Sequence, residues 1–243
     1  MNTPISRPWR RDLRTSAIRP GRYALLLAAA MAAGSAQAAV PASERQALLA
    51  LFEATAGSQW TERAGWRGPA GSECQWTGVR CDDQQRHVIG LRLSNNQLRG
   101  RLPYLGALTQ LRELTVSLNY LHGPLPSLRG LTQLRVLKAN NNLLDGPVPA
   151  LHTTPRLERL MLANNRLSGV MTASRSHLAL REVDISNNLL HGPLPVLVGL
   201  PQIRRFDASF NRWQGTTSDA VYEARVLRPE GAVARTHPPS DAI

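Results

Sequence analysis

Asp184 and Asp207 have the spacing that comes closest to a catalytic carboxyl pair in this sequence. They lie 23 residues apart, which is also the period of a pattern that recurs along most of the chain. If each repeat adds one strand to a parallel sheet, the two carboxyl groups lie about 5 Å apart, close to the roughly 5 to 5.5 Å of a retaining glycosidase pair. An open sheet has no enclosed pocket to desolvate one carboxyl. We therefore expect no catalytic residues and no enzymatic activity.

The histidines are spaced too far apart for a shared metal ion. His122 and His191 occupy the same repeat position but lie three repeats apart, which corresponds to about 14 Å in a stacked sheet. Zinc ligands must lie about 2 Å from a common ion. We expect no metal and no other cofactor.

Cys74 and Cys81 are the only cysteines in the sequence. In an exported chain such a pair is typically a disulfide, and closing this short loop would stabilise the fold by about 2.5 kcal/mol. Two cysteines alone make a weak zinc site, because structural zinc is almost always four-coordinate. The sequence therefore predicts one disulfide ahead of the repeats.

A leucine-rich motif with a constant period of 23 must position these residues. Apolar residues alternate with polar ones, as in a half-buried strand. An asparagine that recurs at one position of each repeat can then hydrogen-bond backbone groups of the turn. A glycine follows where the chain must bend tightly. The six repeats occupy residues 88–215 and open at Val88, Leu111, Leu134, Leu157, Leu180 and Ile203. Such a period predicts a leucine-rich-repeat solenoid of the α/β class with a parallel sheet.

Residues 39–87 precede the repeats and are predicted to form an N-terminal helical cap, because a solenoid cannot leave its end coil open to water. Ser43 and Gln46 fit a capping box that would begin a helix, and Gly57 would stop it. Three tryptophans supply bulk to cover the first coil; they are Trp60, Trp66 and Trp76.

Residues 1–38 are predicted to be a signal peptide, with an arginine-rich segment, an apolar run over 23–33 and the cleavage motif Ala36-Gln37-Ala38. The run is shorter than the about 20 residues that span a bilayer, so no stable membrane insertion is expected. Its removal lowers the formal charge from +12 to +7, and nucleic-acid binding is not expected. The alanine-rich leader suits bacterial export to the periplasm or the medium.

Residues 216–243 are predicted to form a closing segment and a flexible tail.

The cap and repeat motifs together resemble the plant-type leucine-rich-repeat family. The resemblance lies in the stretch from Cys74 to Cys81, in His87-Val88-Ile89-Gly90-Leu91 and in repeats that end Gly-Pro-Leu-Pro. The family includes receptor-kinase ectodomains and polygalacturonase-inhibiting proteins. The resemblance implies a right-handed, curved coil whose parallel sheet lines the concave face and binds peptides, proteins or wall polysaccharides.

The polar strand positions of this concave face are the candidate binding site. They are Arg92, Glu113, Thr115, Lys138, Arg159, Met161, Glu182, Asp184, Arg205 and Asp207. The positions between the two apolar residues of each strand run from basic at the cap end (Arg92) to acidic at the far end (Asp184 and Asp207), whereas Arg159, Glu182 and Arg205 beside them alternate in sign. Like charges side by side are destabilising, so Asp184 and Asp207 together suggest a partner site. Alternatively, Arg181, Arg204 and Arg205 neutralise both carboxylates and the face is merely solvated.

The sequence thus predicts an exported, monomeric, non-catalytic module that binds a protein or peptide partner, including host or cell-wall components. The alternative is a cell-wall polysaccharide-binding protein, or an inhibitor of a wall-degrading enzyme, in which exposed arginines engage acidic sugars. An enzyme that uses Asp184 and Asp207 is a third class.

Overall fold

The computed structural model describes residues 40–171, 179–193, 202–214 and 234–235. The chain divides into two compact units, Met1–Gln37 and Ala38–Ile243, and every described residue belongs to the second unit. The predicted signal peptide, and all of the predicted closing segment and tail except residues 234–235, lie outside the described residues.

The cap begins with helix α2 (Ala42–Ala54), whose N-cap is Pro41 with no side-chain hydrogen bond. The predicted capping box of Ser43 and Gln46 is therefore wrong, because Ser43 already lies inside the helix. The carbonyl of Pro41 accepts the first helical hydrogen bond, from the N–H of Arg45 at 3.0 Å. Proline fixes φ near the helical value, so it sets the start earlier than the serine pattern suggests.

The end of α2 also differs from the prediction that Gly57 stops it. Thr55 is the C-cap, and Ala56 takes a left-handed conformation with φ 55°. Gly57 instead opens the short 3-10 helix η1 (Gly57–Gln59). A Cβ at residue 57 would overlap the ring of Phe52, so glycine is needed there for close packing.

An aromatic cluster forms the centre of the cap. Trp60, Trp66 and Trp76 are all buried, and Phe52 of α2 packs against the first two of them. The ring centroids of Trp60 and Trp66 lie 4.8 Å apart, and those of Trp66 and Trp76 lie 5.1 Å apart. The tryptophans are thus core residues of the cap, as predicted.

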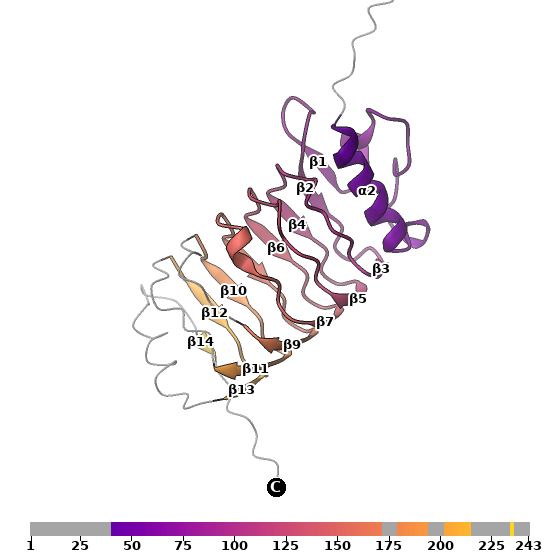
Figure 1. Cartoon of the computed structure of the whole chain (residues 1–243). Helices are drawn as coiled ribbons and strands as arrows, with labels where there is room; N and C mark the ends of the chain where they lie inside the picture. The colour runs from indigo at the N-terminus through magenta and orange to yellow at the C-terminus, as the bar shows by residue number, and fades with distance from the viewer. Residues whose placement is uncertain (1–39, 172–178, 194–201, 215–233, 236–243) are drawn as a thin grey trace, which may run out of the picture. The chain divides into compact units, whose positions relative to one another are not determined.

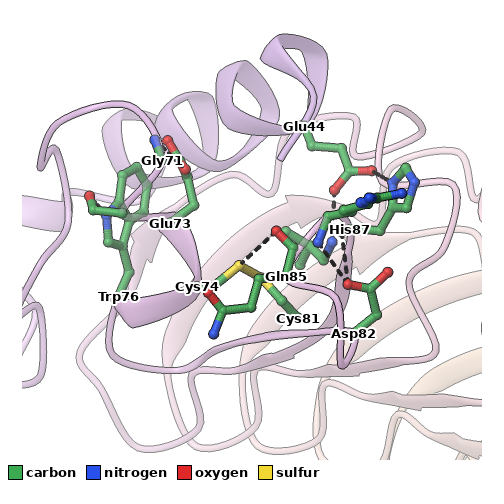
Figure 2. The surroundings of a disulfide bond; sticks show 12 residues. Glu44, Gly71, Glu73, Cys74, Trp76, Cys81, Asp82, Gln85 and His87 are labelled. Carbon is green, nitrogen blue, oxygen red and sulfur yellow. Dashed lines mark hydrogen bonds and ion pairs between the residues drawn. A yellow bond between two sulfur atoms is a disulfide. The ribbon is translucent and has the colours of Figure 1, made fainter. Parts of the chain in front are cut away.

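The disulfide between Cys74 and Cys81 is formed, as predicted. It joins the 3-10 helix η2 (Glu73–Gln75) to strand β1 (Val79–Cys81). Figure 2 shows the side chain of Glu44 reaching from α2 to His87. One oxygen of this buried carboxylate lies 2.7 Å from Nδ1 of His87, and the other accepts the backbone N–H of Val88 at 2.7 Å. The cap is therefore tied to the first repeat by charge-assisted hydrogen bonds as well as by packing.

Removing the disulfide should loosen the cap before the central repeats. The double variant Cys74→Ser, Cys81→Ser is expected to lose about 2.5 kcal/mol, the loop-closure value for so short a link. Coils contact mainly their neighbours in a solenoid, so hydrogen exchange should rise first over residues 40–87. Equal loss of protection over residues 134–167 would contradict this expectation.

Six parallel strands, one from each repeat, form the main body of an eight-stranded sheet, here called the long sheet (Figure 1). They are β2 (Val88–Arg92), β4 (Glu113–Thr115), β6 (Val136–Lys138), β8 (Arg159–Met161), β10 (Glu182–Asp184) and β12 (Arg205–Asp207). β1 pairs antiparallel with β2, and β14 (Ala234–Arg235) pairs parallel with β12. Residues 23 positions apart are partners, as in Leu114 and Leu137, so the sequence repeat is the strand register.

A second sheet, which the sequence did not predict, lies on the other side of the turns. Its six parallel strands are β3 (Arg99–Gly100), β5 (Tyr120–Pro124), β7 (Leu143–Gly146), β9 (Arg166–Val170), β11 (Leu189–Pro193) and β13 (Arg212–Gln214). Here the paired residues are 21 positions apart, as in Arg99 and Tyr120. A short 3-10 helix, η3 (Leu151–Thr153), lies within the third coil. The described residues therefore form a parallel β-solenoid with one N-terminal α-helix.

Buried asparagines connect successive coils, as predicted for the repeat asparagine. Oδ1 of Asn119 accepts the N–H groups of Asn96 and Leu98 at 2.9 and 3.0 Å. Its Nδ2 donates to the carbonyls of Leu93, Val116 and Ser117. Equivalent contacts recur at Asn142, Asn165, Asn188 and Asn211. Each side chain satisfies backbone groups that stacking would otherwise bury without partners.

Candidate functional site

The ten candidate residues lie in two rows on the outer face of the long sheet, the side away from the leucine core. The first row precedes the buried apolar residue at the centre of each strand and the second row follows it. Register partners confirm that the rows are continuous: Glu113, Val136, Arg159, Glu182 and Arg205 in one, and Arg92, Thr115, Lys138, Met161, Asp184 and Asp207 in the other. The repeat spacing therefore placed every candidate on the expected strand.

The cap end of this face is internally paired. Arg92 donates from Nε and Nη2 to Oε2 of Glu113, at 3.0 and 2.8 Å. Arg80 of β1 lies 3.9 Å from the same carboxylate. The hydrogen bond to Glu113, supported by its negative charge, raises the pKa of Arg92 above its usual range. These residues satisfy one another, which fits the predicted solvated, paired surface at this end.

The middle of the face is partly paired and partly open. Arg159 lies 3.5 Å from Glu182 on the next strand, which makes an ion pair between neighbouring strands. Arg205, which follows in the same row, takes part in no ion pair of the described residues. Thr115 is buried rather than displayed, with its hydroxyl 3.5 Å from the carbonyl of Leu91. Its side chain is too short to project past Arg92 and Lys138, its partners on the neighbouring strands.

The far end holds Asp184 and Asp207 as direct register partners. Oδ1 of Asp184 accepts hydrogen bonds from the N–H and hydroxyl of Ser186 at 3.1 and 2.7 Å. Oδ1 of Asp207 accepts the same pair of bonds from Ser209 at 3.0 and 2.6 Å. Each aspartate thus forms an Asx-type turn with the serine two residues later.

The predicted neutralisation of this pair by arginines is not seen. Among the ion pairs of the described residues, none joins Asp184 or Asp207 to Arg181, Arg204 or Arg205. The local serines hold one oxygen of each carboxylate instead. Oδ2 of both aspartates has no hydrogen-bond partner within the described part of the chain, so each carboxylate keeps one oxygen available as an acceptor.

Sequence reasoning missed exposed apolar side chains in the turn that leads to β5 and on strands β5 and β7 of the second sheet. Leu118 is 55% exposed, Tyr120 is 52% exposed and Leu143 is 39% exposed. Leu118 occupies a repeat position that holds asparagine at residues 95, 141, 164 and 187. That break in the asparagine series was the signal available in the sequence.

Two further properties concern metal and membrane. Within the described ranges, no group of three His, Cys, Asp or Glu side chains is arranged to hold a metal ion. No described helix is both long enough and apolar enough to pass through a bilayer. His122 and His191 lie on β5 and β11 of the second sheet, in the same repeat position.

The fold, the asparagine ladder and the disulfide-linked cap define a leucine-rich-repeat protein. A family model described as a leucine rich repeat N-terminal domain matches residues 41–82. The leucine-rich-repeat model of leucine-rich repeat and WD repeat-containing protein 1 matches residues 79–178. Together the two models match residues 41–178, more than half of the chain, so the chain is a leucine-rich-repeat protein.

The relatives of this chain include plant receptor kinases. It is 36% identical over 73 residues to a probable LRR receptor-like serine/threonine-protein kinase of Arabidopsis thaliana, and that match covers 30% of this chain and 11% of the kinase. The chain therefore spans about a tenth of the length of that relative. The ectodomain of BIR2 from the same plant is 27% identical with a TM-score of 0.59, over 71% of this chain and 93% of the ectodomain. The ectodomain of the receptor kinase SOBIR1, at 24% identity, shares the fold with a TM-score of 0.59 over 73% of this chain and 99% of its own.

Proposed function

We propose that this chain is an exported, non-catalytic module that binds a protein or peptide partner on the outer face of the long sheet. The observation that carries the proposal is the pair Asp184 and Asp207, which are direct register partners on adjacent strands and whose Oδ2 atoms have no hydrogen-bond partner in the described structure. A basic side chain of a partner would relieve the repulsion between the two carboxylates and gain charge-assisted hydrogen bonds. The proposed partner therefore presents an arginine or a lysine.

The surroundings of the two aspartates argue against an acid and base pair. Both carboxylates make the same hydrogen bonds to a serine two residues on. General acid and base groups in one site need environments that differ. Equal environments suit a rigid double acceptor, which is what recognition of a cation requires.

Export fits the disulfide, because such bonds persist in oxidising compartments. It also fits the receptor ectodomains among the similar structures. In this proposal, residues 1–38 are a leader that directs export of the chain to a periplasm or to the medium.

A wall polysaccharide is the second candidate partner. The observation in its favour is a set of arginines on the second sheet that take part in no ion pair of the described residues: Arg99, Arg166 and Arg212. Capture of the chain on polygalacturonate beads, with release by salt, would support this alternative and would count against a protein partner.

Replacing both aspartates by asparagine tests the proposed site. Asp184→Asn, Asp207→Asn keeps an Oδ1 acceptor for each serine and removes the repulsion, so the free energy of unfolding should rise by about 0.5 kcal/mol. Binding to partners recovered from the native surroundings should fall at least about tenfold, as for loss of a charged pair at an interface. Pull-down and thermal unfolding of the same preparations measure both effects.

The matched control is Asp145→Asn, which removes an exposed carboxylate from β7 on the second sheet. This variant should keep both partner binding and stability. Unchanged binding by the double variant would remove the aspartate pair from the site, and equal loss of binding by Asp145→Asn would show a general charge effect instead.

A further inference from the structure

One residue of every repeat is held in the left-handed conformation, just before the buried asparagine. These residues are Asn95, Leu118, Asn141, Asn164, Asn187 and Phe210, with φ between 51° and 57°. Asparagine tolerates this region because its short polar side chain bonds locally. A leucine there costs about 1 kcal/mol. Leu118 therefore strains the backbone at a position where the fold itself favours asparagine.

Burial does not offset this strain at Leu118. Its side chain is 55% exposed, and Tyr120, on the other side of the inward-facing Asn119, is 52% exposed. Leu143 takes the repeat position of Tyr120 in the next coil and is 39% exposed. We call Leu118, Tyr120 and Leu143 the Leu118 patch. It combines exposed apolar side chains with a strained backbone, and neither feature serves the folded chain by itself.

Basic residues lie on the Leu118 patch and on neighbouring strands. The guanidinium of Arg99 lies 4.8 Å from the centre of the Tyr120 ring. Lys138, two residues before Asn140, and Arg166 on β9 take part in no ion pair of the described residues. Over strands β3, β5, β7 and β9, which are fully described, Asp145 is the one acidic residue. The border of the patch is therefore complementary to an acidic partner.

Two side-chain amides next to the patch suit an extended peptide backbone. Nδ2 of Asn164 donates to Oδ1 of Asn141 at 3.0 Å. This bond orients the pair and leaves Nδ2 of Asn141 and Oδ1 of Asn164 pointing to other partners, one donor and one acceptor. A polypeptide backbone presents the same alternation of donors and acceptors.

We propose that the Leu118 patch docks an extended, acidic peptide segment of another exported protein, with apolar side chains seated on Leu118 and Tyr120. Branched or aromatic side chains would bury the exposed leucines, and carboxylates would meet Lys138 and Arg166. This site lies at the turn between the sheets and does not depend on the aspartate pair of the proposed function.

The test uses fluorescence polarisation of the purified full-length chain with labelled eight-residue peptides. One peptide alternates leucine with glutamate, a second replaces glutamate by lysine, and a third replaces leucine by serine. The first should bind at least about tenfold more tightly than the others, since both the apolar and the charged contacts are needed. Equal binding of all three, or no binding of the first, would overturn the proposal.

Leu118→Asn separates docking from folding. Asparagine relieves the left-handed strain, so this variant should melt at a higher temperature than the parent chain while binding the leucine–glutamate peptide at least about tenfold more weakly. The matched control Leu189→Ser changes an equally exposed leucine at the repeat position of Leu143, on β11. It should leave peptide binding unchanged.

Two outcomes would assign the patch to a different occupant. If the parent chain sediments as a dimer that Leu118→Asn converts to a monomer, the patch joins two copies of this chain and the peptide proposal is wrong. If Leu118→Asn abolishes capture on polygalacturonate while peptide binding persists, the patch recognises a polysaccharide.

The double variant Asp184→Asn, Asp207→Asn tests whether the patch is independent of the aspartate pair. Loss of peptide binding in this variant as well would show that the patch is not an independent site.

Discussion

Gly100→Ala is expected to lower the free energy of unfolding by about 3 kcal/mol or more, although it adds only one methyl group. Gly100 has φ 109°, where an L side chain is strained, and a Cβ there would overlap the carbonyl oxygen of Ala54. That oxygen belongs to the last residue of α2, so relief would require β3 to move away from the cap. The free energy of unfolding from urea titration checks the magnitude.

Gly146→Ala is the matched control for this prediction. Gly146 holds the same repeat position with φ 71°, but an added Cβ would lie 3.3 Å from Cβ of Pro124, a contact that can relax. It should therefore cost only the left-handed strain, about 1 kcal/mol. If the two variants lost equal stability, backbone strain and not the contact between cap and repeats would explain Gly100.

Asn119→Ala should cost about 3 kcal/mol, because it leaves two buried donors without an acceptor. The N–H groups of Asn96 and Leu98 both bond Oδ1 of Asn119, and no other acceptor is available to them in the described structure. Thermal unfolding followed by circular dichroism should show a large drop in the melting temperature.

Asn141→Gly provides the comparison, since it removes an asparagine of the left-handed turn position, which is not part of the ladder, while glycine keeps the left-handed conformation. Its stability should change by less than about 1 kcal/mol. A comparable loss in Asn141→Gly would mean that any asparagine side chain in these turns matters, and that the buried ladder has no special weight.

The long sheet could be predicted because the same residue types recur at the same spacing as the strand register. Leu114 and Leu137 are partners in both the sequence pattern and the sheet. The disulfide and the buried tryptophans followed from residue type and from the need to cover an end coil. Each of these features depends on local composition, which a sequence displays directly.

The second sheet escaped prediction because its outward positions carry no constant residue type. Tyr120, Arg166 and Leu189 all occupy equivalent places in their repeats. Its strands depend on backbone pairing that the glycine and the buried asparagine permit, and no alternation of side-chain type records it. The start of α2 was missed for a different reason, since Pro41 overrides a serine pattern that fits a capping box.

The surroundings of the aspartate pair were only half predicted. Adjacent carboxylates followed from the period, but the arginines that seemed available on neighbouring positions do not reach them. Ser186 and Ser209 hold the carboxylates instead. An aspartate followed two residues later by serine is a known turn pattern, so the sequence did contain this signal.

The difference in register between the two sheets has a consequence for how such an array can grow by duplication. In the long sheet, partners are 23 residues apart, so a copied repeat sets every residue beside its own duplicate, and a charge meets a like charge. In the second sheet, partners are 21 residues apart, so a copy sets each residue beside a different one, as Asp145 lies beside Arg166. An exact copy of a coil would therefore set like charges side by side on the long sheet but not on the second sheet, and Asp184 with Asp207 is such a like-charged pair on the long sheet.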